Sequence, residues 1–267
     1  MHRMEDINRQ TWSNSWALRE YGRGKGYIDE GERVVLDRAT ADGPKRVLDI
    51  GVGGGRTAGL LQGKGDYLGI DYTPEMVELA RRNHPSLTFR HMDARDLSAL
   101  PDGAFDLVNF SYNGIDSVDQ EGRMAVLREV ARVLEPGGQF VFSTFHRNWD
   151  GFSKLPDYRH IEWTLDPLRL SFRLFRFIEG GILKAVRTRR HAALEVRAAD
   201  HAILMHGAHD FGIMVHTTTY PHLIGQLREA GFAEVIEVFN RDGERIDADW
   251  SGSVEYVHVI ARKRVTS

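Results

Sequence analysis

Short apolar runs alternate with amphipathic stretches along much of the chain. The runs are four to eight residues long and are bounded by glycine, proline or acidic residues, as buried strands usually are. The stretches between them place apolar residues three or four positions apart, as in helices with one buried face. The pattern predicts seven strands, at residues 47–50, 67–70, 87–92, 105–110, 139–144, 232–239 and 255–262.

Strand–helix alternation with short connections predicts an α/β fold, in which helices cover both faces of a doubly wound, largely parallel sheet. The connection at residues 240–252 is too irregular for the crossover helix that joins two parallel strands. We therefore expect the seventh strand to run antiparallel to its neighbours.

The segment between the fifth and sixth strands interrupts the alternation. Residues 146–218 carry scattered aromatic and arginine side chains. They end in two strand-like runs, His201–Met205 and Phe211–Thr217, which flank a glycine-containing turn and predict a β-hairpin. We interpret the whole segment as a lid that packs over the carboxyl edge of the sheet.

The first 43 residues also lie outside the alternation and have an amphipathic, helical pattern. Glycines at positions 22, 24 and 26 interrupt that pattern, because glycine favours a loop over a helix interior. This segment predicts a helical cap. The expected organisation is a cap at residues 1–43, a core at 44–145 and 219–267, and a lid at 146–218.

The first predicted strand leads into a turn rich in glycine. Gly51, Gly53 and Gly55 follow the run that ends at Ile50. Without Cβ atoms, these residues can adopt positive φ angles and let a ligand approach the backbone. A helix that starts at Arg56 would point its first N–H groups at the same ligand. The turn predicts a nucleotide-type cofactor, but not a dinucleotide, because that fingerprint requires glycine where the chain has Arg56.

Composition excludes several classes of function. The chain has no cysteine, which excludes disulfides, thiolate metal sites and cysteine nucleophiles. Its net charge is −3, so no overall attraction to nucleic acid or to an anionic membrane is expected. The sequence shows neither an apolar leader nor an apolar run long enough to span a membrane. We expect a cytoplasmic protein.

Four segments match the motifs of one enzyme family in order and in spacing. Val47-Leu48-Asp49-Ile50-Gly51-x-Gly53-x-Gly55 resembles motif I of the class I S-adenosylmethionine-dependent methyltransferases. Three further segments resemble, in turn, the acidic segment after motif I, the adenine-contacting segment and the turn before strand five: residues 69–76, 93–97 and 127–138. The resemblance implies a Rossmann-like fold with an antiparallel last strand, and S-adenosylmethionine as the cofactor.

The resemblance also implies roles for polar residues at the strand ends. Asp71 ends strand two, twenty residues after Gly51, where its carboxylate can accept both ribose hydroxyls. Asp93 would accept from the adenine amino group, beside the backbone N–H of Ala94. Asp49 either braces the turn or contacts the methionine amino group. The predicted cofactor set is Tyr21, Asp49, Gly51, Gly53, Asp71, Tyr72, Asp93, Ala94 and Asn109.

The end of strand four bears on the acceptor. Nucleic-acid and glutamine methyltransferases of the family carry Asn/Asp-Pro-Pro-Tyr there, which holds a planar amide or amino group. This chain keeps Asn109 and Tyr112 but has Phe110 and Ser111 in place of the two prolines. The departure argues against a base's exocyclic nitrogen and favours a small molecule.

Histidines and aromatic residues supply the remaining candidates, although each could equally be a packing residue. The predicted catalytic residues are Tyr112, His146 after strand five, and His209, which lies beside an aspartate. The predicted substrate contacts are Asn113, Trp149 and Phe211. The histidines at 206, 209, 216 and 222 show no ligand spacing on one element, so no metal is predicted.

The sequence thus predicts methyl transfer to an O or N atom of a small molecule, by in-line displacement. Two alternatives stay open: methylation of a tRNA base or a protein, docked through the arginines between residues 169 and 190, and a catalytically inactive, cofactor-binding regulatory subunit. The net charge argues against nucleic-acid and membrane partners. A homodimer stays open, and the sequence does not identify the acceptor.

Overall fold

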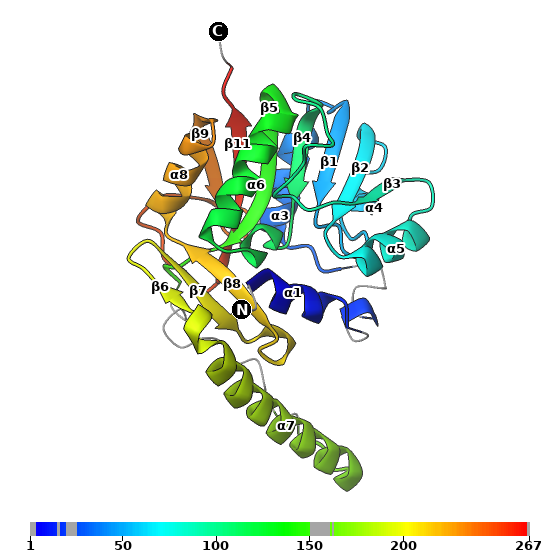
Figure 1. The fold of residues 1–267 in the computed structure, drawn as a ribbon, viewed down its shortest axis with the longest axis vertical. Coiled ribbons are helices and arrows are strands. Elements are labelled where there is room, and N and C mark those ends of the chain that lie inside the picture. Colours follow the sequence, from blue (N-terminus) through cyan, green and yellow to red (C-terminus); the bar gives the residue numbers. More distant parts are fainter. Residues whose placement is uncertain (1–3, 15–16, 20–25, 150–160, 162, 266–267) are drawn as a thin grey trace.

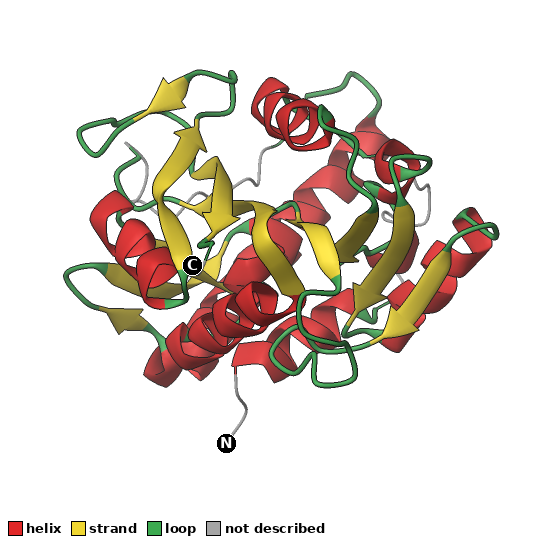
Figure 2. Cartoon of the chain, turned by 90° about the horizontal axis from the view of Figure 1, so that it is seen from above, coloured by secondary structure: helices red, strands yellow, loops and turns green. Residues whose placement is uncertain are grey.

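The structure, a computed structural model, describes residues 4–14, 17–19, 26–149, 161 and 163–265 of the 267-residue chain. In this part of the chain, an eight-stranded sheet forms the centre, with helices on both faces (Figures 1 and 2). Its strands are β1 (Arg46–Ile50), β2 (Asp66–Asp71), β3 (Thr88–His91), β4 (Phe105–Phe110), β5 (Leu134–Phe145), β9 (Phe232–Phe239), β10 (Arg245–Ile246) and β11 (Tyr256–Lys263). The helices against it are α3 (Glu30–Thr40), α4 (Ala58–Leu61), α5 (Pro74–Asn83), α6 (Gln120–Val133) and α8 (Tyr220–Glu229).

The strand order is β10-β9-β11-β5-β4-β1-β2-β3. The strands from β1 to β5 are parallel to one another, whereas β11 runs antiparallel to both β5 and β9, as predicted. The predicted count of seven strands is wrong by one. The additional strand, β10, pairs antiparallel with β9. It has only two residues, too few for an alternating pattern to be visible in the sequence.

Alternation along β1 explains why both faces of the sheet are covered. Leu48 points to the face where α6 packs, in one core cluster with Leu127. Its neighbour Val47 points to the opposite face and packs with Val35 and Leu36 of α3. Successive side chains of a strand alternate between faces, so an unbroken apolar run requires a helix on each side.

A second, three-stranded sheet lies beside the carboxyl edge of the large one (Figure 1). Its strands are β6 (Val196–Arg197), β7 (His201–His206) and β8 (Ile213–Thr218), in that order. β7 and β8 form the predicted hairpin. The first helix, α1 (Met4–Trp12), packs on this hairpin, where Met4 and Ile7 share a cluster with Met205.

Asn8 of α1 fixes the helix between the hairpin and the large sheet. Its Nδ2 donates to the carbonyl oxygens of Ser117 and Met214, each at 2.9 Å. Its Oδ1 accepts from the N–H of Met214 at 2.8 Å. Ser117 belongs to a short 3₁₀ turn, η1 (Gly114–Ser117), which follows β4. The N-terminal helix is therefore held against the ends of the central strands.

The predicted lid contains a long helix that the sequence analysis did not predict. α7 (Pro167–His191) has 25 residues and is capped by Asp166, whose Oδ1 accepts from the N–H groups of Leu168 and Arg169. It extends away from the rest of the molecule (Figure 1). Within α7 only Gly180 is buried. The helix thus contributes little to the core.

Candidate functional site

A cavity of about 420 Å³ opens at the carboxyl ends of β1, β2, β3 and β4. This is where open α/β sheets bind their ligands, and the volume is typical of small-molecule sites, which span roughly 300–1,000 Å³. Glu5 and Trp12 of α1, together with Tyr27, lie against it from the N-terminal segment. The remaining walls are mainly loops after strands, at residues 50–54, 71–73, 92–95 and 110–118.

The glycine turn forms one wall of the cavity. Gly51, Gly53 and Gly55 have φ angles of 65°, 53° and 88°, which confirms the predicted positive values. A Cβ atom on Gly51 would stand 2.7 Å from the ring of Phe110. The predicted helix after the turn is present, but α4 begins at Ala58, two residues after Arg56, and has only four residues.

Asp71 joins the glycine turn to the end of β2. Its Oδ2 accepts from the N–H of Gly53 at 2.9 Å, and its Oδ1 accepts from the N–H of Thr73 at 2.8 Å. Burial raises the pKa of this carboxyl, and the two backbone hydrogen bonds oppose that rise. Each oxygen keeps a second lone pair for a ligand hydroxyl. The position and chemistry fit a ribose, as the resemblance implied.

Asp49 and Asn109 do not line the cavity, although both were in the predicted cofactor set. They are register partners on β1 and β4, and the Asn109 amide donates to Asp49 Oδ1 at 2.7 Å. Asp49 Oδ2 accepts from the hydroxyls of Thr57 and Tyr67. Both side chains are fully buried. Of the two alternatives for Asp49, the geometry is that of a brace for the turn.

A chain of charged groups lies at the end of the cavity nearest β3. Asp93 accepts from Arg95 Nη2 at 2.7 Å, and Arg95 Nη1 donates to Glu5 Oε1 at 2.9 Å. Burial acts to raise the pKa of Asp93, but the hydrogen bonds from Arg95 outweigh it and lower the pKa. Ala94, between them, also lines the cavity. The hydroxyl of Tyr72 and Glu5 Oε2 are buried with no hydrogen-bond partner among the described residues.

Glu5 and Tyr72 also line the cavity, so its walls carry polar as well as apolar side chains. Sequence reasoning missed Glu5 because nothing near it in the chain indicates contact with a residue ninety positions away.

The opposite end of the cavity contains an ion pair that was also not predicted. Arg56 donates from Nη1 and Nη2 to the two carboxylate oxygens of Glu32, at 2.7 and 2.6 Å. Its guanidinium lies 5.1 Å from the ring centre of Tyr112. Arg56, which stands where the dinucleotide fingerprint requires glycine, thus connects the glycine turn, α3 and the end of β4.

Tyr112 is the one predicted catalytic residue in the lining of the cavity. Tyr112 and Asn113 both adopt left-handed backbone, with φ angles of 56° and 57°. Side chains other than glycine rarely occupy this region, and such strain is often found at functional sites. The kink leaves the Tyr112 side chain 59% exposed at the cavity.

The two predicted catalytic histidines lie elsewhere. His146 is buried, its Nδ1 accepts from the N–H of Asn148 at 3.0 Å, and its ring meets Trp250 edge-on. Burial lowers its pKa to about 4. His209 packs edge-on against Trp12, with the ring centres 4.8 Å apart. Neither residue is in the lining of the cavity.

None of the three predicted substrate contacts lines the cavity either. Phe211 is buried in the cluster that joins α1 to the hairpin, so its ring is part of a core. The N–H of Asn113 donates to Ser143 Oγ at 2.8 Å. Trp149 forms a β-bridge with Gly252. Tyr21, predicted to approach the cofactor, lies outside the described residues.

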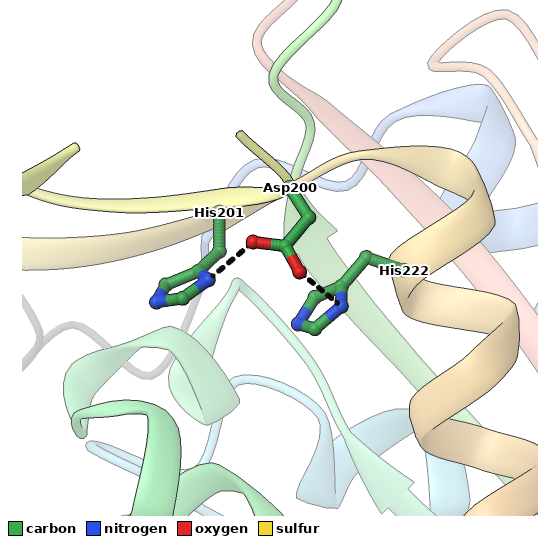
Figure 3. Close-up of side chains that lie close together, drawn as sticks. All are labelled: Asp200, His201 and His222. Atoms are coloured by element: carbon green, nitrogen blue, oxygen red, sulfur yellow. Dashed lines mark hydrogen bonds and ion pairs between the residues drawn. The ribbon is translucent and has the colours of Figure 1, made fainter. Parts of the chain in front are cut away.

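Of the four histidines considered above, His222 joins a cluster of three ligand-type residues, and its partners there are Asp200 and His201. Asp200 Oδ1 lies 2.8 Å from His201 Nδ1, and Asp200 Oδ2 lies 3.1 Å from His222 Nδ1 (Figure 3). These ligand-type atoms lie within 4.8 Å of one another. However, the two rings are stacked, 5.5 Å apart and 16° from parallel. Zinc needs nitrogen lone pairs that converge at about 2.0–2.1 Å, so the geometry is that of a carboxylate bridging two imidazoles. The absence of a metal stays a prediction.

Residues 47–138 match a family model described as a methyltransferase domain. This segment contains β1 to β4 and the loops that form most of the cavity. Over this segment the chain is similar to S-adenosylmethionine-dependent methyltransferases. The similarity supports S-adenosylmethionine as the cofactor.

Two sequence relatives match less than half of the chain. A demethylmenaquinone methyltransferase of Thermus thermophilus is 35% identical over 119 residues, which are 42% of this chain and 53% of the relative. A malonyl-[acyl-carrier protein] O-methyltransferase of Halorhodospira halophila is 37% identical over 130 residues, 43% of each chain. The chain spans about half the length of the curated relatives it matches.

Solved structures resemble the chain over nearly its whole length. A structure of the 1,6-didemethyltoxoflavin-N1-methyltransferase of Burkholderia thailandensis, with 1,6-didemethyltoxoflavin and S-adenosylhomocysteine bound, has a TM-score of 0.51 at 18% identity and covers 96% of this chain and 82% of that one. A methyltransferase of Methanosarcina mazei has a TM-score of 0.55 at 19% identity and covers 91% of this chain and 100% of its own. At such identity the likeness shows the fold alone.

Proposed function

We propose that this protein transfers the methyl group of S-adenosylmethionine to an O or N atom of a small molecule. The observation that carries the proposal is the cavity: the family's motif residues form one side of it, and α1 and Tyr27 close over it from the N-terminal segment. A site enclosed in this way suits a small acceptor held in line with the donor, with water excluded.

The chain's own residues account for each part of the cofactor. Asp71 would accept from the ribose hydroxyls, and Asp93 and the N–H of Ala94 would bind the adenine. Gly51 and Gly53 would bring backbone close to the methionine portion, while Asp49 and Asn109 hold the turn from behind. When bound, the cofactor supplies an electrophilic methyl group on a sulfonium.

The acceptor's nucleophile needs a base only if it carries a proton at the working pH. No histidine among the described residues lines the cavity. Tyr112 is therefore the residue we propose beside the acceptor, either as a hydrogen-bonding hydroxyl or as an aromatic wall. The names of the relatives refer to acceptors as different as demethylmenaquinone and a malonyl-[acyl-carrier protein], so they support a small acceptor without selecting one.

The alternative of a tRNA or protein substrate has less support. It depends on the arginines between residues 169 and 190, and these lie on α7, no residue of which lines the cavity. A catalytically inactive, cofactor-binding subunit is the other alternative. It would share the cofactor residues and differ only in the outcome of an activity measurement.

Calorimetric titration with S-adenosylhomocysteine tests the cofactor assignment. Asp71→Ala removes two charge-assisted hydrogen bonds to the ribose, so we expect binding to weaken by roughly 100-fold or more. Asp71→Asn keeps the shape and should weaken binding less. Asp66→Ala, at the exposed start of the same strand, is the matched control. Unchanged binding by Asp71→Ala would show that the ribose assignment is wrong.

Transfer of a labelled methyl group from S-adenosylmethionine tests the acceptor class. The panel should contain phenols, amines and small carboxylic acids, together with bulk tRNA and unfolded protein. We expect label in a small molecule. Label only in tRNA or protein would select the second reading, and tight cofactor binding with no transfer would select the inactive subunit.

A further inference from the structure

The positive charge of the chain is concentrated on one helix. α7 contains six arginines and one lysine but a single glutamate, so it carries +6. The whole chain carries −3, which leaves −9 for all other residues. The overall charge, from which no membrane attraction was expected, therefore conceals a basic helix on an acidic protein.

The same helix exposes a continuous apolar face. Its members recur every three or four positions, which places them on one side of the helix over about 27 Å. Their exposed fractions are 81% for Leu168, 65% for Phe172, 60% for Phe175, 60% for Ile178, 60% for Ile182 and 56% for Val186. Together they expose roughly 800 Å², whereas the largest apolar patch of a typical monomer reaches about 300–600 Å². We call these six residues the α7 stripe.

The C-terminal part of α7 is fastened to the body. Arg187 Nη1 donates to the carbonyl oxygen of His209 at 3.1 Å, and Lys184 Nζ lies 4.8 Å from the ring centre of Phe211. The N-terminal part extends away from both sheets (Figure 1). The α7 stripe is thus presented at the end of an arm, and a flat surface could reach it.

We propose that α7 docks on an anionic lipid surface, with the α7 stripe inserted among the acyl chains and its basic residues against the lipid phosphates. Helices that lie in a membrane interface combine an aromatic and leucine-rich face with flanking arginine and lysine. In the described part of the chain, no helix is long and apolar enough to cross a membrane, so α7 would lie in the plane of the surface.

Charge and apolarity together favour lipid over two other occupants. A second copy of the chain could cover the stripe, but pairing α7 with α7 would bring two helices of +6 together. A nucleic acid would neutralise the charge but leave the apolar residues in water. An anionic bilayer satisfies both. The proposal does not depend on which acceptor is methylated.

Co-sedimentation with vesicles tests the proposal. We expect the protein to bind vesicles of phosphatidylcholine and phosphatidylglycerol in a 3:1 ratio, and not vesicles of phosphatidylcholine alone. Each basic residue near such a surface contributes about fivefold in affinity. A variant with Arg169, Arg189 and Arg190 changed to glutamine should therefore bind about 100-fold more weakly, and salt should weaken binding of the unchanged protein.

A second variant, Phe172→Gln/Phe175→Gln/Ile182→Gln, should lose binding even at low salt. Arg33→Gln and Val265→Gln, which alter exposed residues elsewhere, are the matched controls and should bind normally. Titration with S-adenosylhomocysteine confirms that each variant is folded and separates this test from that of the proposed function.

Three results would overturn the proposal. One is the absence of binding to the anionic vesicles. Another is a dimer, seen by light scattering, that the apolar variant dissociates while neither protein binds lipid. The third is binding to bulk tRNA that depends on the α7 arginines, with no lipid binding.

Discussion

A fully buried ion pair holds the cavity wall that follows β4. Asp116 of η1 pairs with Arg123 of α6, and both side chains are completely buried. Asp116 also accepts from the N–H of Phe145 at 2.6 Å and from Thr144 Oγ1 at 2.9 Å. Arg123 Nε donates to Gln226 of α8 at 3.1 Å. One pair therefore connects η1 with α6, β5 and α8.

Breaking this pair should be costly, whereas removing both charges should not. Arg123→Met leaves a carboxylate buried without its cation, which typically costs about 3–5 kcal/mol of the free energy of unfolding. In Asp116→Asn/Arg123→Met no charge stays buried, and the amide oxygen can still accept from Phe145. We expect the double variant to recover at least about 2 kcal/mol of the loss, since replacing both partners of a buried pair is often nearly neutral.

The loss of unfolding free energy in Arg123→Met should also depend on pH. Burial raises the pKa of Asp116 to about 6 even with Arg123 beside it, and loss of the cation raises it further. A carboxyl whose folded pKa exceeds its unfolded value binds protons more tightly when folded, so its folded state gains stability as the pH falls through the raised pKa. The difference in the free energy of unfolding between the double variant and Arg123→Met should therefore be smaller at pH 5.5 than at pH 7.5.

Urea unfolding followed by circular dichroism, at both pH values, measures these free energies, and titration with S-adenosylhomocysteine measures the consequence for the cavity. Gly114, Ile115 and Ser117 of η1 line that cavity, so the single variant should also bind the cofactor product more weakly. A cost below about 1 kcal/mol for Arg123→Met, or a double variant as unstable as the single one, would refute the reasoning.

Two further predictions concern Tyr112 and His146. Tyr112→Phe should keep most of the methyl transfer rate if the ring is only a wall, and should lose about 10²–10⁴-fold if the hydroxyl takes part in proton transfer; Tyr112→Ala should lose activity in both cases, and full activity of Tyr112→Ala would exclude the residue from the site. His146 is neutral when folded because burial lowers its pKa to about 4, so the stability it confers is present above pH 6.5 and falls by about 2 kcal/mol as the pH drops to 5. His146→Asn should flatten that part of the pH profile of unfolding, and an unchanged profile would contradict the burial argument.

Local sequence patterns were sufficient for the central sheet. β4 and β9 have the predicted bounds, because each is mainly apolar and contrasts with the glycine-containing turns around it. The sequence around α7 also contained usable signals, since Asp166 and Pro167 form a helix start and the apolar residues after them recur at helical spacing. What no local pattern reveals is that this apolar face is exposed, because burial depends on what packs against it.

The residues of the site also divide into those that a local pattern reveals and those that depend on distant contacts. Asp71 and the glycine turn lie within one strand–helix–strand unit, β1–α4–β2, whose two parallel strands are neighbours in the sheet. Glu5 and Arg56 reach the cavity through contacts with distant elements. The predicted roles of His209 and Phe211 assumed that the hairpin turn faces the cavity, whereas it packs on α1.

The two sides of the cavity consequently differ in how much the family reveals about them. The side made by β1, β2 and β3 is built from motif residues, and it is the side to which we assign the cofactor. The other side depends on α1, which Asn8 attaches both to η1 and to β8 of the hairpin. The family model matches residues 47–138, which contain the first side and not α1. On the function proposed above the acceptor lies against the second side, so we expect its identity to follow from how α1 packs on the hairpin and not from the motifs.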